Sequence, residues 1–182
     1  EAAKYAQSKN VLLIHAAGNE SKNKDKEENY PSRQLLSGEV LNNWMEIGAN
    51  SSKKGKKVVA SFSNYGQTTV DVFAPGVDIY STIPDNKYTN ESGTSMAAPS
   101  ATGVAALLLQ YFPDLKPQEL KDVLIKTAVP YSKKVDVPGL FKKRIFKKLG
   151  KKSVRKKFKT LSVSGGFINA NAAAKELLKN RK

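Results

Sequence analysis

Short runs of apolar residues alternate along this chain with segments whose apolar positions recur every three or four residues. Val11–Ile14 is a run of four apolar residues, which is typical of a strand buried on both faces of a parallel sheet. Residues 44–49 predict a second strand. Residues 58–66 and 70–82 predict short strands broken by turns, through which the sheet continues.

Helices are predicted before, between and after these strands. The alanine-rich residues 1–9 favour a helix. Residues 95–111 are apolar nearly all round, so we expect a helix that is buried rather than amphipathic. Pro117 suits the first turn of a further helix, and Asn169 can cap a last one over residues 170–179. Buried strands alternating with helices predict the α/β class, with a mainly parallel sheet flanked by helices.

Composition narrows the class of protein. With 182 residues and 40% hydrophobic content, the chain is long and apolar enough for about one soluble globular domain. No apolar run approaches the roughly 20 residues that span a bilayer, and the first residues lack the layout of a secretory signal. The absence of cysteine excludes disulfides and thiolate metal sites. The sequence contains no cluster of metal ligands either, so we expect no cofactor in this chain.

The net charge of +15 is concentrated in one segment. Phe141–Lys159 holds eleven Lys or Arg and no acid, which leaves the other 163 residues with about +4 (15 − 11). We name residues 131–164, which contain it, the basic insertion. Phe141, Ile145 and Leu149 predict a short amphipathic helix there that ends at Gly150.

We interpret the basic insertion as a solvated surface segment between the last two helices. The alternative is an anionic partner such as a membrane surface, nucleic acid or an acidic glycan. No aromatic array or nucleic-acid motif accompanies the charge, so we expect weak contact with an anionic surface at most and no specific nucleic-acid binding.

The segment Gly93-Thr94-Ser95-Met96-Ala97-Ala98-Pro99 carries the most specific chemistry. A serine at a sharp turn into a helix has an exposed oxygen, and the helix N-terminus favours the negative charge that develops during attack. This segment resembles the nucleophile motif of the subtilisin-like serine proteases, the subtilases. The resemblance implies a subtilisin-like fold, a serine endopeptidase activity on polypeptides, and Ser95 as the nucleophile.

Further segments extend the resemblance over roughly residues 11–177, apart from residues 21–29 and the basic insertion. Ala16-Ala17-Gly18-Asn19-Glu20 resembles the oxyanion segment, which implies that Asn19 donates to the oxyanion and that Ala16, Ala17 and Gly18 line part of the primary specificity pocket. The other matching segments are Ala60–Gly66, Val72–Thr82 and Gly166–Ala170. Their order is that of the C-terminal portion of a subtilase peptidase domain, to which we assign residues 1–182.

The rest of the catalytic triad is missing from the chain. In subtilases the order is Asp, His, Ser, and the first two precede the oxyanion asparagine. We interpret His15, the one histidine, as a structural residue rather than a base, and Asp71 and Asp78 as strand-end residues. We therefore expect the chain alone to be inactive and its partner to be the upstream half of the same protein.

The family resemblance carries two further expectations and leaves one alternative open. Export from the cell is the habit of the family, and calcium sites are compatible with the full-length protein. A non-catalytic subtilase-like domain that serves as an interaction module is the alternative to a protease.

Overall fold

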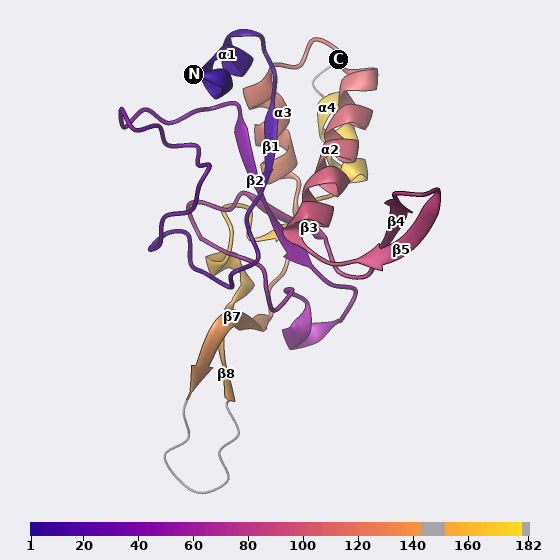
Figure 1. The fold of residues 1–182 in the computed structure, drawn as a ribbon. Coiled ribbons are helices and arrows are strands. Elements are labelled where there is room, and N and C mark those ends of the chain that lie inside the picture. The colour runs from indigo at the N-terminus through magenta and orange to yellow at the C-terminus, as the bar shows by residue number, and fades with distance from the viewer. Residues whose placement is uncertain (143–151, 180–182) are drawn as a thin grey trace, which may run out of the picture.

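A five-stranded sheet with helices against one face forms the body of the molecule, for which a computed structural model describes residues 1–142 and 152–179 (Figure 1). The strand order is β1-β2-β3-β9-β6, with β1 to β9 parallel and β6 antiparallel to β9. Their bounds are β1 Leu13–Ala16, β2 Trp44–Asn50, β3 Val72–Pro75, β6 Val129–Pro130 and β9 Gly166–Phe167. The predicted α/β class with a mainly parallel sheet is confirmed.

The helices follow the sequence prediction closely. The main helices are α1 Ala2–Ser8, α2 Thr94–Tyr111, α3 Pro117–Lys126 and α4 Ala170–Lys179. The Asn169 side chain accepts a hydrogen bond from the Ala172 N–H at 2.9 Å, as its predicted cap role requires. Helix α2 lies across β1, β2 and β3, and α4 packs against both α2 and α3.

Helix α2 is buried on one face only, contrary to the prediction. Its small residues Ala97, Ala101 and Ala105 are at most 4% exposed and pack on the sheet in the first hydrophobic cluster. Leu107 on the other face is 50% exposed. A Cβ built on Gly103, which is also exposed, would have no neighbouring atom within 4 Å. The elements described here cover only part of the surface that the apolar sequence of α2 presents.

Strand β1 is likewise less buried than its apolar run predicts. All four of its residues are partly exposed. It forms one edge of the sheet and pairs with β2 alone. Among the described residues, this apolar segment is therefore covered on the side of β2 and open at the edge of the sheet.

The predicted strands within residues 58–66 are wrong. This segment forms two isolated bridges, Asn50 with Val59 and Asn23 with Tyr65, and otherwise consists of turns and irregular chain. Val58, Val59 and Tyr65 are buried as loop residues in the second hydrophobic cluster, on the opposite face of the sheet from α2. Their apolar pattern reflects that burial rather than strand pairing.

Residues 70–82 do contain two strands, but the sheet does not continue through both. Only β3 joins the main sheet. The second strand, β4 Ile79–Ile83, pairs antiparallel with β5 Lys87–Glu91 in a separate two-stranded ribbon. Figure 1 shows this ribbon extending away from the body beside the start of α2.

The basic insertion is an antiparallel hairpin at its base, and Phe141, where the predicted amphipathic helix was to begin, lies in a strand. Strand β7 Lys134–Lys142, which contains Phe141, pairs with β8 Lys152–Lys157. Ile145, Leu149 and Gly150, on which the helix prediction also rests, lie outside the described residues.

The base of the hairpin is also not a merely solvated surface. Val135, Val137 and Phe158 are buried in the second hydrophobic cluster. The Phe158 ring lies 5.1 Å from that of Phe73 and 4.9 Å from that of Phe167, between ring centroids. Part of the insertion thus completes the core beneath the sheet.

The carboxylate of Glu46 is buried on a part of the sheet that α2 does not cover. Glu46 on β2 is 2% exposed, and its oxygens accept hydrogen bonds from Lys24 and from the Trp44 indole N–H, the latter at 2.7 Å. His15 lies opposite on β1, with its Nδ1 3.0 Å from the same carboxylate. The structure thus gives His15 the structural contact that its sequence context predicts.

The described residues hold no helix that is both long enough and apolar enough to cross a membrane.

We predict that Glu46 makes the stability of the protein acid-sensitive. Burial acts to raise its pKa, but the partners His15, Lys24 and Trp44 outweigh burial and hold the pKa below its ordinary value. The stabilisation is complete above that ordinary value, 4.5, and is lost as the pH falls through the lower folded pKa.

The test is to measure the free energy of unfolding in urea from pH 3 to pH 7. Glu46→Gln should flatten the fall on the acid side and destabilise the protein at neutral pH by about 3–5 kcal/mol, because Lys24 is left unpaired. The control, Glu39→Gln, changes an exposed carboxylate and should retain the acid dependence of the unchanged protein. Equal acid slopes for Glu46→Gln and the unchanged protein would contradict the prediction.

Candidate active site

Ser95 is held at the carboxyl edge of the parallel sheet. After β3, Gly76 turns the chain into the β4–β5 ribbon, and the Gly93 N–H returns to bond the Gly76 carbonyl at 2.8 Å. A Cβ on Gly76 would lie 2.7 Å from the Gly93 oxygen and 2.8 Å from Ala49 Cβ, so this crossing needs glycine. The chain then enters α2 directly, with Ser95 exposed as its second residue.

Asn19 is tied to the same helix by Thr94. The Asn19 Oδ1 accepts hydrogen bonds from the Thr94 N–H at 2.9 Å and from the Thr94 hydroxyl at 3.0 Å. The same hydroxyl accepts the Gly18 N–H at 3.1 Å. Thr94 is 1% exposed, so these bonds are shielded from water. They fix the loop that follows β1 against the first turn of α2.

This arrangement leaves two hydrogen-bond donors open beside the serine. The N–H groups of Met96 and Ala97 bond the Gly93 carbonyl, whereas the Ser95 N–H has no partner among the described residues, and neither has Asn19 Nδ2. A Cβ built on Gly93 would lie 3.5 Å from Asn19 Nδ2 and 3.6 Å from Ser95 N. Both donors therefore flank one point at the start of α2, where the helix dipole also favours negative charge.

Asn64 holds the oxyanion segment from its other side. Its side chain is fully buried and donates to the Ala17 carbonyl at 2.9 Å. Its Oδ1 accepts the N–H of Lys22 at 2.8 Å and of Glu20 at 3.2 Å. Its own backbone N–H donates to the Gly18 carbonyl at 2.9 Å. The loop carrying Asn19 is thus clamped between Thr94 and Asn64.

The Glu20 carboxylate joins this clamp. Burial acts to raise its pKa, but hydrogen bonds from the Asn64 amide and from the backbone N–H groups of Asn19 and Glu20 outweigh burial and lower the pKa. The Asn64 Nδ2 lies 2.6 Å from the Glu20 Oε2. A negative charge is thereby kept one residue after Asn19.

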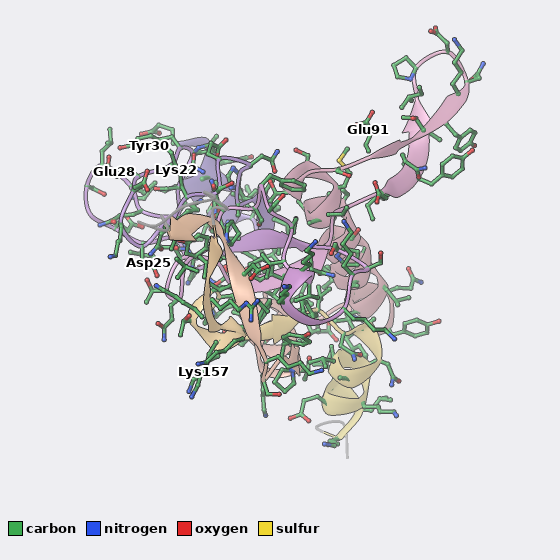
Figure 2. All side chains as sticks on the ribbon, turned by 90° about the horizontal axis from the view of Figure 1, so that it is seen from below. Lys22, Asp25, Glu28, Tyr30, Glu91 and Lys157 are labelled. Carbon is green, nitrogen blue, oxygen red and sulfur yellow. The ribbon has the colours of Figure 1, made fainter. Side chains whose placement is uncertain are left out.

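A second carboxylate anchors the neighbouring loop. Asp25 accepts the Gln67 N–H at 2.6 Å and the Thr68 N–H at 3.0 Å, and both Thr68 and Thr69 hydroxyls bond it as well. Figure 2 shows Asp25 with Lys22, Glu28 and Tyr30 on one side of the start of α2, and Glu91 on the other. The surface loop predicted over residues 21–29 is confirmed, and it is fastened to the body.

The structure brings the predicted site residues together in part. Asn19 and Ser95 lie at one edge, with Ala16 at the end of β1 and Gly18 beside Thr94. The Ala17 side chain is fully buried in the second hydrophobic cluster, so Ala17 presents backbone rather than side chain to this edge.

Sequence reasoning gave no role to Thr94 or Asn64. Both lie within segments that resemble the family. The signal that could have found them is a polar residue among apolar neighbours, because a polar side chain that is buried is normally hydrogen-bonded.

No base accompanies the serine within residues 1–142 and 152–179, where no histidine or carboxylate is hydrogen-bonded to Ser95. His15 bonds Glu46 instead. Asp71 directly precedes β3 and forms an ion pair with Arg33 at 2.8 Å, consistent with its interpretation as a strand-end residue. Asp78 directly precedes β4 and bonds Ser92 through its N–H.

The same described residues contain no group of three or more His, Cys, Asp or Glu placed to hold a metal ion.

Comparison with known proteins agrees with this geometry. The sequence model of the Subtilase family matches residues 1–162. Subtilisin DY of Bacillus licheniformis is 36% identical over 129 residues, which cover 70% of this chain and 43% of that protein. The cell wall-associated protease of Bacillus subtilis is 42% identical over 119 residues, covering 65% of this chain and 12% of that protein.

A further relative and a solved structure extend the comparison. The extracellular basic protease of Dichelobacter nodosus is 38% identical over 137 residues, covering 69% of this chain and 21% of that protein. The crystal structure of a cold-adapted subtilisin-like serine proteinase aligns with a TM-score of 0.59 and 35% identity, covering 70% of this chain and 42% of that one. The chain thus spans less than half the length of these relatives.

We predict that Gly18 cannot carry a side chain. Its φ is +102°, and a Cβ there would lie 2.5 Å from both Asn64 Nδ2 and Glu20 Oε2. Gly38 is the matched control, because its φ is +85° and nothing lies within 4 Å of its Cβ position. Gly38→Ala should cost about 1–2 kcal/mol from backbone strain alone.

The two variants are compared by their free energies of unfolding in urea. Gly18→Ala should cost about 1–3 kcal/mol more than Gly38→Ala, because it overpacks the clamp as well as straining the backbone. An equal loss of stability in both variants would show that the side chains of Asn64 and Glu20 move aside without cost, and would contradict the prediction.

Proposed function

The chain belongs to the subtilase family, and on that premise we propose that it is part of a serine endopeptidase that hydrolyses peptide bonds through an acyl-enzyme on Ser95, with Asn19 as oxyanion donor. One observation carries the proposal. Thr94 holds the Asn19 amide so that Nδ2 and the Ser95 N–H flank the same point, and both donors lack a partner among the described residues. Two such donors beside an exposed serine suit acyl transfer.

The reaction proceeds in two halves. The Ser95 Oγ attacks the carbonyl carbon of the scissile peptide while a histidine base takes its proton. The carbonyl oxygen becomes an anion that Asn19 Nδ2 and the Ser95 N–H stabilise, with the N-terminus of α2 adding favourable potential. The histidine then protonates the leaving amine, which leaves an ester on Ser95. A water molecule gives a proton to the same base and attacks the ester, and the base then protonates the Ser95 Oγ as the acid product leaves.

Substrate binding falls to the segment before Asn19. We assign Ala16, Ala17 and Gly18 to the wall and rim of the primary specificity pocket. Ala17 contributes through its backbone, because its side chain lies in the core. The clamp by Asn64 keeps this wall in a single conformation, which favours a bound substrate with its carbonyl facing the two donors.

The upstream part of the same polypeptide supplies the missing groups in this proposal. In subtilases the catalytic Asp and His precede the oxyanion asparagine, and this chain spans 43% of subtilisin DY. The uncovered face of α2, with Leu107 50% exposed and Tyr111 66% exposed, supports a further layer packed against it.

Export of the full-length protein is also part of the proposal. It is supported by the name of the relative from Dichelobacter nodosus, an extracellular basic protease.

In the full-length protein, loss of either site residue should remove activity in a distinct way. Ser95→Ala should lower kcat about 10⁶-fold. Asn19→Ala should lower kcat about 10²–10³-fold, a magnitude taken from subtilisin itself, with little change in KM. Steady-state kinetics on a quenched fluorogenic peptide measures both. The surface variant Gln67→Ala, which keeps the backbone N–H that bonds Asp25, is the control and should retain full activity.

Unchanged kcat in Ser95→Ala would contradict the proposal. If the full-length protein does not hydrolyse the peptide, and its upstream part lacks the catalytic Asp or His, the alternative of a non-catalytic interaction domain would replace the proposed protease function.

Residues 1–182 by themselves should be catalytically silent, because the base that activates Ser95 is not among them. The measurement is labelling by a fluorescent fluorophosphonate, with the full-length protein as positive control and its Ser95→Ala variant as negative control. The fragment should give no more label than the Ser95→Ala protein. Rapid stoichiometric labelling of the fragment at Ser95 would show that the serine is activated from within this chain.

A further inference from the structure

Two segments far apart in the sequence bring ten basic side chains to the same end of the molecule. One is the loop around η1 Gly55–Lys57, which follows β2, and the other is the base of the β7–β8 hairpin, which packs against η1. All ten side chains are exposed. They are Lys53, Lys54, Lys56, Lys57, Lys133, Lys134, Arg155, Lys156, Lys157 and Lys159. We name this set the basic rim.

The charge of the basic rim is hardly compensated. Within the described part of the chain, Arg155 alone of the ten has an ion-pair partner, Asp136 at 3.2 Å. Residues 51–62, 126–142 and 152–165 contain no other acid. The segments that form the rim therefore carry ten positive charges against one negative charge, a net of +9 (10 − 1). Asp25 of a neighbouring loop lines a pocket with Lys156 and Lys157, but its carboxylate is hydrogen-bonded to Gln67, Thr68 and Thr69.

The hairpin also tolerates repulsion within itself. Lys134 and Lys157 are direct cross-strand partners. Like charges opposite each other on two strands destabilise the pairing, and an anion bound between them would reverse that effect. Figure 2 shows the Lys157 side chain pointing outward from the body, free to reach such an anion.

A groove leads from the basic rim toward the candidate active site. A groove of about 350 Å³ runs between the η1 loop and β7, lined by Lys53 and Lys57 and by Val77. Val77 follows Gly76, whose carbonyl bonds the Gly93 N–H at the entrance to α2. Asp136 also lines the groove, but it is paired with Arg155.

The hairpin touches the oxyanion loop as well. A Cβ on Gly139 of β7 would lie 2.7 Å from the backbone oxygen of Ser21, two residues after Asn19. Figure 1 shows the hairpin extending from the end of the sheet at which α2 begins. A polypeptide bound at Ser95 therefore has the basic rim within reach of its flanking residues.

We propose that the basic rim is an exosite for acidic segments of the polypeptide substrate, so that the protease favours chains with Asp or Glu clustered outside the scissile bond. This inference rests on the proposed endopeptidase function. The groove leading from the active-site edge favours a polypeptide over a membrane or a glycan, which would need no such connection. Paired lysines suit carboxylates as point charges, and opposite charge accelerates encounter.

The experiment uses the full-length enzyme and one fluorogenic core peptide in five forms. The core is tested alone, and with four Glu or four Gln joined by a short linker on its N-terminal or its C-terminal side. On at least one side the Glu form should exceed its Gln counterpart in kcat/KM by about tenfold or more at low salt. The preference should shrink toward unity in 0.5 M NaCl, because exposed charges are screened.

Three double variants locate the preference. Lys53→Gln with Lys57→Gln, and Lys134→Gln with Lys157→Gln, should each reduce the Glu-to-Gln ratio, and all four together should bring it to about one. Lys9→Gln with Lys175→Gln removes the same charge next to α1 and on α4, and should leave the ratio unchanged.

Each outcome bears on one claim. Cleavage of the untailed core tests the endopeptidase function, so its failure is separate from failure of the exosite. Equal cleavage of Glu and Gln forms, or a preference that survives the fourfold variant, would overturn the exosite. Co-sedimentation with phosphatidylserine vesicles, or retention on heparin, that is lost in the fourfold variant while the Glu preference is absent would assign the basic rim to an anionic surface instead.

Discussion

The geometry of this site depends on one interaction, the capture of the Asn19 amide oxygen by Thr94. An isolated asparagine on a loop samples many rotamers, and its amide could point either way. Two hydrogen bonds from Thr94, at 2.9 and 3.0 Å, direct the oxygen toward α2 and therefore turn the amide nitrogen toward the serine. The donors are then oriented before any substrate binds, which is what gives electrostatic stabilisation its value.

Packing supports this interaction from beneath. Thr94 occupies its place because α2 approaches the sheet through alanines, and because Gly76 allows the strand and helix backbones to cross closely. Asn64 holds the opposite side of the Asn19 loop through bonds to backbone groups that are buried or partly buried. A close-packed interior transmits the position of each of these groups to the next, so the two open donors are a property of the whole edge of the sheet.

Much of this could be read from the sequence, and the failures have physical causes. The segments around Ser95 and Asn19 carry local patterns of small residues. Helix α2 ends shortly before Pro113, α3 begins at Pro117 and α4 directly follows Asn169. The roles of Thr94 and Asn64 could not be predicted, because each acts on a residue 75 and 47 positions away along the chain. The apolar residues of 58–66 led to a wrong prediction of strands, because loops that line a core are also apolar. Phe158 was hidden inside a run of lysines, although its ring sits at the centre of an aromatic cluster.

In the proposed reaction, Asn19 Nδ2 and the Ser95 N–H both donate to one developing oxyanion. A crystal structure of the full-length protein with a peptide phosphonate bonded to Ser95 Oγ measures this directly. We expect one phosphonyl oxygen about 2.7–3.1 Å from both nitrogens, with Asn19 Oδ1 still bonded to Thr94. A phosphonyl oxygen turned toward solvent, or an Asn19 amide rotated away from Thr94, would contradict it.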